Sequence, residues 1–243
     1  MGKDFVRELL KEKNIDEIWM IARRKMRLES MEEEFCGRGR ALPLDLTDTD
    51  SFESMKKLLK EEQPQIVYLV NAAGAGRMGK VENIDEKDHA FVLDINVRAL
   101  TMMSRVCLPY MHKGSKIIQL CSGSAFLPQP EFASYAASKS YVLSFSRALG
   151  QEVKKKGITV TCVCPGPVNT EFFEAAGSEI APAKKRFLVE SKDVVQKAMK
   201  DAKAGKELSV YGISMKLVHL AGKLLPTRVV LSVMNRMMTK NEE

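Results

Sequence analysis

The chain has no long apolar run. Its 243 residues contain no stretch of eighteen or more apolar residues, and no charged segment followed by an apolar one at the start. A membrane-spanning helix needs the first pattern and a secretory signal peptide needs the second. We therefore expect neither, and we expect a cytoplasmic protein.

Cysteine and histidine are both scarce. The five cysteines are Cys36, Cys107, Cys121, Cys162 and Cys164. They form no CxxC pair, which is typical of free core thiols in a reducing compartment, and Cys162 and Cys164 would share one face of a strand. The three histidines stand far apart, so a metal centre built on histidine is not expected: they are His89, His112 and His219.

The charge is unbalanced toward the basic side. The formal net charge is +7 and the pI is about 9.1. Such a chain attracts anions, and a phosphorylated cofactor is sufficient to use that property. Nucleic acid is the competing partner, but lysines, arginines and acids are interleaved over most of the chain. We therefore expect no nucleic-acid binding.

Apolar periodicity predicts helices that alternate with strands. The expected helices are 3–13, 25–35, one capped by Thr47 or Asp48, 85–111 and 132–155, and the expected strands are 16–22, 40–45, 65–70, 116–120 and 158–164. This alternation favours parallel pairing with helices on both sheet faces. We expect one α/β domain over 1–243, a doubly wound, Rossmann-type, three-layer sheet that binds ligands at the carboxyl ends of its strands.

Three residues have a spacing that suits acid/base chemistry on an alcohol or a ketone. Tyr135 and Lys139 are four positions apart, so they share one helix face and the ammonium can favour the ionised phenol. This would bring the pKa of the phenol down from about 10 toward neutrality. Ser122 precedes Tyr135 by thirteen positions. The tyrosine and lysine alone could merely share an exposed helix face, so the interpretation depends on the surrounding motifs.

Further motifs follow one another in a fixed order. They are Asp45-Leu46, Asn71-Ala72-Ala73-Gly74, Asn96, and Pro165-Gly166-Pro167-Val168-Asn169-Thr170. Together with Ser122, Tyr135 and Lys139, they resemble the short-chain dehydrogenase/reductase (SDR) family from Gly2 to about Thr170. The resemblance implies an NAD(P)-dependent oxidoreductase that interconverts an alcohol and a ketone or aldehyde by hydride transfer.

The resemblance also implies four catalytic residues. Tyr135 would be the general acid or base at the substrate oxygen, and Ser122 would hydrogen-bond the same oxygen. Lys139 would bind the ribose of the nicotinamide and lower the pKa of Tyr135. Asn96 would hold a water that relays protons. An asparagine inside a helix can instead satisfy a neighbouring carbonyl or kink the helix, and that alternative stays open.

The cofactor-binding residues are implied in the same way. Asp45 and Leu46 would border the adenine. The segment from Asn71 through Ala72 and Ala73 to Gly74 would contact the adenosine and ribose. The nicotinamide carboxamide would be reached by the backbone at Pro165, Gly166, Val168 and Thr170.

The cofactor preference is predicted from the end of the strand 16–22. Arg23 and Arg24 follow it, and no acid stands there to bind the ribose 2′-hydroxyl of NAD. Arginine pairs with the 2′-phosphate of NADP, so NADP(H) is preferred and NAD(H) remains the alternative. The two arginines could also simply solvate a loop.

The start of the sequence departs from the family pattern. Gly2 resembles the end of the glycine-rich turn, and the first strand and the leading glycines are absent. That strand lies near the middle of such a sheet, so its loss would expose two rows of backbone groups. Either Met1 is an internal methionine, or the protein is N-terminally truncated and non-catalytic and acts through protein contacts. We expect an extended chain to bind NADP(H) and melt cooperatively, and the chain as written to do neither.

The region after Thr170 concerns substrate and partners. Phe172, Phe173 and the segment 175–187 would line an apolar pocket for a lipophilic carbonyl compound. From about 208 the tail is basic and amphipathic, and it resembles hydroxysteroid dehydrogenase-like members. It could contact a membrane surface or cover the substrate, but packing on the domain or on a partner subunit is favoured. The helices 85–111 and 132–155 would form a homodimer or homotetramer.

Overall fold

The computed structural model describes residues 1–35, 37–177 and 187–232. Its strands are β1 Ile18–Ala22, β2 Gly39–Pro43, β3 Ile66–Asn71, β4 Met111–Leu120, β5 Thr159–Val163, β6 Val168–Asn169, β7 Val189–Glu190 and β8 Leu208–Ser209. Its α-helices are α1 Gly2–Leu9, α2 Lys25–Glu34, α3 Thr49–Glu62, α4 Glu86–Leu93, α5 Leu100–Cys107, α6 Ala133–Val153, α7 Phe172–Ala175, α9 Ser191–Lys203 and α10 Ile213–Leu224. None of the described helices is long and apolar enough to cross a membrane.

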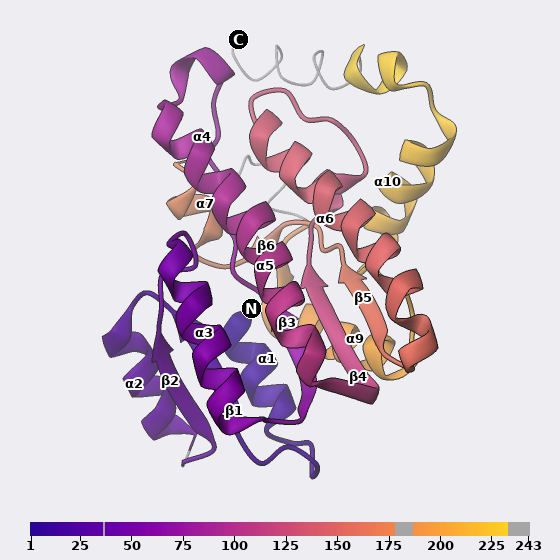
Figure 1. Cartoon of the computed structure of the whole chain (residues 1–243). Coiled ribbons are helices and arrows are strands. Elements are labelled where there is room, and N and C mark those ends of the chain that lie inside the picture. The colour runs from indigo at the N-terminus through magenta and orange to yellow at the C-terminus, as the bar shows by residue number, and fades with distance from the viewer. Residues whose placement is uncertain (36, 178–186, 233–243) are drawn as a thin grey trace.

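The central sheet is parallel and has helices on both faces, so the predicted doubly wound α/β fold is confirmed. Its order is β3-β4-β5-β8, and β1 pairs with β2 alongside it. In Figure 1, β2 lies at the left and β4 and β5 lie at the right. Helices α3, α5 and α6 pack on one face of the sheet, and α1 and α9 pack on the other.

The sequence explains why β4 lies at the centre. Ile117 and Ile118 point to opposite faces of the sheet, and both are fully buried. A strand covered on both faces needs such consecutive apolar residues, and parallel strands between two helical layers are of this kind. At the start of α3, the Asp48 carboxylate accepts a hydrogen bond from the Asp50 amide, which is the predicted cap.

A slot separates β1 from β3. Among the described residues, β1 pairs only with β2 and β3 pairs only with β4. The backbone edges that face the slot line a cleft of about 2100 Å³. The slot lies where the family resemblance places its first strand.

Two helices span this slot and hold the parts of the sheet together. On one face, α1 packs Phe5 and Leu9 in a cluster with Tyr68 of β3, and packs Val6 in a cluster with Met20 of β1. On the other face, Met55 and Leu59 of α3 belong to a cluster that includes Trp19, Ile21 and Leu69. Apolar burial above and below the slot therefore replaces backbone pairing across it.

Several boundaries differ from the prediction. The helical stretch predicted to reach Met111 contains a π-helical segment at Asp94–Ala99 and ends in a 3-10 turn at Leu108–Tyr110. Met111 instead begins β4, which starts earlier than predicted because its first residues follow the edge of β3. The predictions on Cys36, on residues 178–186 and on the end of the tail fall outside the described residues.

Candidate active site

Ser122, Tyr135 and Lys139 meet at the carboxyl end of β4. Ser122 follows β4 and caps a short 3-10 turn, where its hydroxyl accepts a hydrogen bond from the Ser124 amide at 3.1 Å. Tyr135 and Lys139 lie in the first turns of α6, and the Lys139 ammonium is 5.6 Å from the centre of the Tyr135 ring. The phenol also interacts with the Ser122 hydroxyl by a hydrogen bond. All three residues line the same cleft.

The electrostatics of Tyr135 differ from the prediction. Burial raises the pKa of the phenol, and the hydrogen bond with Ser122 offsets only part of that effect. The Lys139 ammonium donates a hydrogen bond to the Leu120 carbonyl at 3.0 Å, and burial lowers its own pKa. The net shift of the Tyr135 pKa is therefore upward in this arrangement, because desolvation of the phenol outweighs the contribution of Ser122.

An aromatic cover explains this burial. Tyr135 is 7% exposed, and its ring stacks on Phe132 with centroids 4.3 Å apart and meets Phe172 at 5.2 Å. Phe172 in turn contacts Phe173 edge-on. Phe172 and Phe173 were predicted to line an apolar pocket, and both line the cleft.

Asn96 ties two segments of the site together. Its amide nitrogen donates to the Ala75 carbonyl at 2.8 Å and to the Ser138 hydroxyl at 2.9 Å, and its oxygen accepts from the Ala75 amide at 2.9 Å. It lies in the π-helical segment, a local irregularity that occurs often at functional sites. The contacts of Asn96 with the Ala75 backbone therefore fit the simpler alternative, in which an asparagine satisfies nearby backbone groups.

Gly74 lies close to the side chains of Asn96 and Lys139. A Cβ there would be 3.1 Å from the Asn96 oxygen and 3.4 Å from the Lys139 ammonium. Only a residue without a side chain lets the backbone come this close to both. The loop after β3, the π-helical segment and α6 are thus packed against one another at this point.

The two arginines after β1 lie along the cleft with different contacts. The Arg23 guanidinium lies over the Phe91 ring at 5.0 Å, whereas Arg24 is 3.9 Å from the Glu171 carboxylate. Arg27 binds the same carboxylate at 3.0 Å, and its hydrogen bond is the main cause that lowers the pKa of Glu171. Both arginines after β1 are surface side chains, so each can change partner at low cost.

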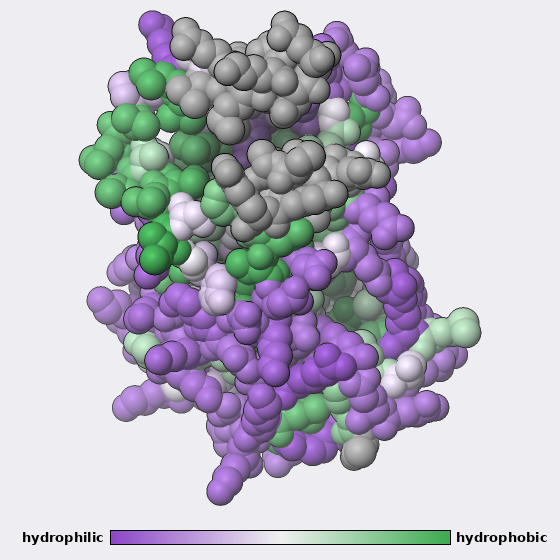
Figure 2. Space-filling model, turned by 180° about the vertical axis from the view of Figure 1, so that it is seen from behind, coloured by the Kyte–Doolittle hydropathy of each residue, from purple (hydrophilic) through white to green (hydrophobic). Residues whose placement is uncertain are grey.

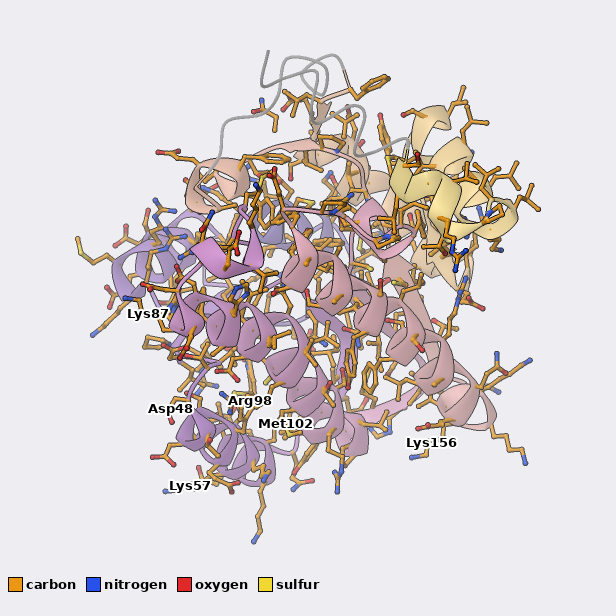
Figure 3. All side chains as sticks on the ribbon, turned by 90° about the horizontal axis from the view of Figure 1, so that it is seen from above. Asp48, Lys57, Lys87, Arg98, Met102 and Lys156 are labelled. Carbon is orange, nitrogen blue, oxygen red and sulfur yellow. The ribbon has the colours of Figure 1, made fainter. Side chains whose placement is uncertain are left out.

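Asp45 and Leu46 form a turn beside β1. Burial would raise the pKa of Asp45, but hydrogen bonds from the amide and hydroxyl of Thr47, with the charge of Arg23, outweigh it and lower the pKa. Arg98 donates to the Thr47 carbonyl at 2.6 Å and so fixes this turn. Figure 3 shows Arg98 next to Asp48 at the start of α3.

The remaining predicted cofactor residues surround the same cleft, although Asp45 itself lies outside its lining. Gly2, Ala72, Ala73, Pro165, Gly166, Val168 and Thr170 all line it. Asn71 also borders it, but its side chain donates to Gln119 at 2.9 Å and to Ser104 at 3.2 Å, away from the loop after β3. We assign Asn71 a structural role between β3, β4 and α5.

Three features were missed from the sequence. The first is Phe132, which the sequence places at the start of a helix and which stacks on Tyr135. The second is the pair of Arg27 and Glu171, which lines one side of the cleft. The third feature is a cluster of three cysteine sulfurs behind Lys139. Within it, burial raises the pKa of the Cys121 thiol, but hydrogen bonds from Cys162 and Cys164 outweigh this and lower it. The alternation of Cys162 and Cys164 along one strand was the available signal.

Comparisons with known proteins point to one family. A family model described as short chain dehydrogenase matches residues 1–181. Oxidoreductase UcpA of Escherichia coli (strain K12) is 30% identical over 161 residues, which cover 64% of this chain and 61% of that protein. An uncharacterized oxidoreductase of Staphylococcus epidermidis is 26% identical over 170 residues, 69% of this chain and 73% of that protein. The chain thus spans about three fifths of the length of the first of these relatives.

Solved structures share the fold at low sequence identity. A short-chain dehydrogenase from Sphingobium yanoikuyae in complex with NADPH superposes with a TM-score of 0.78 at 21% identity, covering 95% of this chain and 91% of that one. A short chain dehydrogenase/reductase from Burkholderia phymatum in complex with NAD gives 0.78 at 18% identity, covering 91% and 89%. At these identities the likeness concerns the arrangement of strands and helices.

Proposed function

The chain belongs to the short-chain dehydrogenase/reductase family, and from this premise we propose that it is an NADP(H)-dependent oxidoreductase that interconverts an alcohol and a ketone or aldehyde. The observation that supports this most directly is the meeting of Ser122, Tyr135 and Lys139 in one cleft at the carboxyl edge of a parallel sheet. Ligands of open α/β sheets bind at that edge.

The cleft suits a dinucleotide and a small substrate. Small-molecule pockets are typically about 300–1,000 Å³. The cleft, which includes the slot between β1 and β3, measures about 2100 Å³ and so has room for both the dinucleotide and the substrate. Gly74 gives a bare backbone surface beside Asn96 and Lys139, as close contact with a flat ligand requires. When bound, the nicotinamide ring supplies or accepts the hydride.

The protein's own residues move and hold protons. The Tyr135 hydroxyl gives its proton to a carbonyl oxygen during reduction, and takes one from an alcohol during oxidation. The raised pKa of Tyr135 keeps the phenol protonated at neutral pH, which is the form that reduction requires. Ser122 holds the same oxygen by a hydrogen bond, and Lys139 would bind the ribose hydroxyls of the cofactor.

The preference for NADP(H) rests on Arg23 and Arg24. Both line the cleft after β1, where the adenosine ribose would lie. The 3.9 Å contact of Arg24 with Glu171 is a solvated surface pair, and such pairs contribute little to stability. A 2′-phosphate therefore competes for Arg24 at small cost.

The tail contributes an apolar surface. Met215 of α10 reaches Gly123 and Gly166, and His219 stacks on Phe126 at 4.4 Å, so one side of α10 packs on the domain. The exposed apolar side chains of this region are Ile213, Leu217, Leu220, Leu224, Leu225 and Val229. Figure 2 shows a hydrophobic patch at the upper left, where α10 lies in that view.

We propose a subunit contact for this surface and for the long helices, which would give a homodimer or homotetramer. Single exposed apolar residues are common, but a continuous stripe marks an interaction site. Met102 of α5 and Tyr141 of α6 are also partly exposed, and Figure 3 shows Met102 on the outer side of its helix. The substrate class that fits beside Phe172 and Phe173 is a lipophilic carbonyl compound.

A second function is favoured by one observation: no strand of the described residues pairs with the edges of β1 and β3 that face each other. Exposed strand edges accept an additional strand from another chain. The alternative is therefore a non-catalytic protein that acts through protein contacts.

Fluorescence titration with NADPH separates the two functions. It should be done on the chain itself and on a chain that carries an added apolar strand ahead of Met1, in each case with Arg24→Glu and the matched surface control Lys57→Glu. The enzyme proposal predicts saturable binding by the extended chain, weakened by Arg24→Glu and unchanged by Lys57→Glu. Absence of saturable binding in every form would overturn it and favour the binding protein.

A further inference from the structure

Three cysteine side chains converge behind the active-site end of the sheet. Cys162 lies in β5, Cys164 follows it, and Cys121 follows β4. The parallel register pairs Leu120 with Val163, so Cys121 lies opposite Cys164 on the neighbouring strand. The three sulfur atoms lie within 4.8 Å of one another, and those of Cys162 and Cys164 are 3.9 Å apart.

These distances suit a shared metal ion. A thiolate-bound ion such as Zn²⁺ has metal–sulfur bonds of about 2.3 Å, so three sulfurs arranged trigonally around it lie about 4 Å apart. The 3.9 Å pair already has this separation, and the third sulfur needs only a small rotamer adjustment. A buried cysteine often serves as a small apolar residue, but apolar packing does not require three sulfurs to meet at one point.

The surroundings limit the number of ligands. Cys121, Cys162 and Cys164 are 3%, 0% and 0% exposed. Their neighbours in the core include Leu100, Val142, Leu143 and Val210. Within the described residues, the group that could hold an ion consists of these three cysteines alone. Such a buried site offers three sulfur donors, and the Ser146 hydroxyl lies beside Cys162.

A cation and a route of access are also present. The buried Lys139 ammonium acts electrostatically on all three sulfurs and so offsets part of the negative charge of a metal–thiolate group. Cys121 lines the large cleft, so an ion can arrive from that side. The Cys121 thiol lies 3.1 Å from the Lys139 carbonyl, which is the contact it would give up.

We propose that Cys121, Cys162 and Cys164 form a binding site for one thiophilic metal ion, Cu(I). Structural zinc sites are almost always four-coordinate, whereas soft thiolate ligands also select Cu(I). A group of three thiols that no other cysteine, histidine or carboxylate of the described residues joins therefore fits Cu(I) better than Zn²⁺. Each thiol that binds releases its proton to solvent, and no oxidation or reduction takes place. This proposal does not depend on the oxidoreductase function.

The test is an anaerobic titration of the reduced chain 1–243 with Cu(I) against a chromophoric Cu(I) chelator. It uses a background with Cys36→Ser, so that Cys107 is the only cysteine outside the cluster. We expect one ion per chain, and X-ray absorption should show three sulfur neighbours at about 2.3 Å. Cys164→Ser and Cys162→Ser should each weaken binding by more than the roughly 10–100-fold that loss of an outer-shell partner costs. Cys107→Ser, a matched buried control in another cluster, should leave the affinity unchanged.

Three results would overturn the site. Equal weakening by Cys107→Ser, or fewer than three sulfur neighbours, would mean that the ion binds elsewhere. A variant that fails to fold could lose binding for that reason alone, so the same titration is repeated in concentrated urea. If the unfolded chain binds Cu(I) as tightly as the native chain, the fold does not build the site. Circular dichroism of each variant before titration shows which case applies.

Discussion

The slot between β1 and β3 predicts that an added strand stabilises the chain. Met1 packs in a cluster with Ala72, and a Cβ on Gly2 would be 3.9 Å from the Ala72 Cβ, so α1 begins beside the carboxyl end of β3. A strand that runs parallel to β1 and β3 would therefore end next to Met1 and need only a tight turn. The perturbation is a leader of about five valine and isoleucine residues and a glycine turn, fused ahead of Met1.

The size of the effect follows from the two edges. The leader faces the five residues of β1 and the six of β3, and its five residues could form two backbone hydrogen bonds each. At about 1 kcal/mol per hydrogen bond, these bonds contribute roughly 10 kcal/mol. Ordering the eight residues of the leader and its turn costs about 1.5 kcal/mol each, so the two contributions nearly cancel. The net gain then comes from five buried apolar side chains, on the order of 5–10 kcal/mol after allowance for a compact unfolded state. That is comparable with the whole stability of a typical domain.

Urea denaturation measures this gain. Trp19 is the single tryptophan and lies in β1 beside the slot, so its fluorescence reports on that edge, while circular dichroism reports on the whole fold. We expect coincident cooperative transitions for the apolar leader, and separate or broad transitions for the chain itself and for a glycine–serine leader of equal length. Equal midpoints for both leaders, or a sharp transition of the chain itself that NADPH shifts upward, would refute the reasoning.

Two further predictions concern single side chains and are made for the apolar-leader chain. Asn96→Ala removes three hydrogen bonds of a buried side chain and should lower the free energy of unfolding by about 2–4 kcal/mol. Asn83 is exposed, so Asn83→Ala should change it by less than about 0.5 kcal/mol. Equal effects of the two variants in urea would contradict the tie through Asn96. Burial acts to raise the pKa of Asp201, but hydrogen bonds from Lys197, Lys206 and Ser209 outweigh it and lower the pKa. The stabilisation from Asp201 should therefore be fully present above pH 4 and be lost as the pH falls below about 3.9 toward the lower folded-state pKa. Asp201→Asn should accordingly destabilise the protein at pH 7 and do so progressively less in acid. A constant difference from pH 7 to pH 3 would show that the charge is not responsible.

The sequence predicted the meeting of Ser122, Tyr135 and Lys139 because motifs at the carboxyl ends of parallel strands must share one edge of the sheet. It did not predict the direction of the pKa shift of Tyr135. That shift depends on Phe132 and Phe172, which both cover the phenol, and Phe172 comes from α7, far along the chain from Tyr135. Local spacing indicates which residues meet, whereas desolvation depends on packing between distant segments.

The central claim is that the Tyr135 hydroxyl transfers the proton in a hydride-transfer reaction. The most direct measurement compares the apolar-leader chain with its Tyr135→Phe variant for NADPH-dependent reduction of a panel of lipophilic ketones, with NADPH binding followed in parallel by fluorescence. Phenylalanine keeps the aromatic packing against Phe132 and removes only the hydroxyl. We predict a fall in turnover of about 10²–10⁴-fold with nearly unchanged NADPH affinity. Equal turnover by both proteins would contradict the claim.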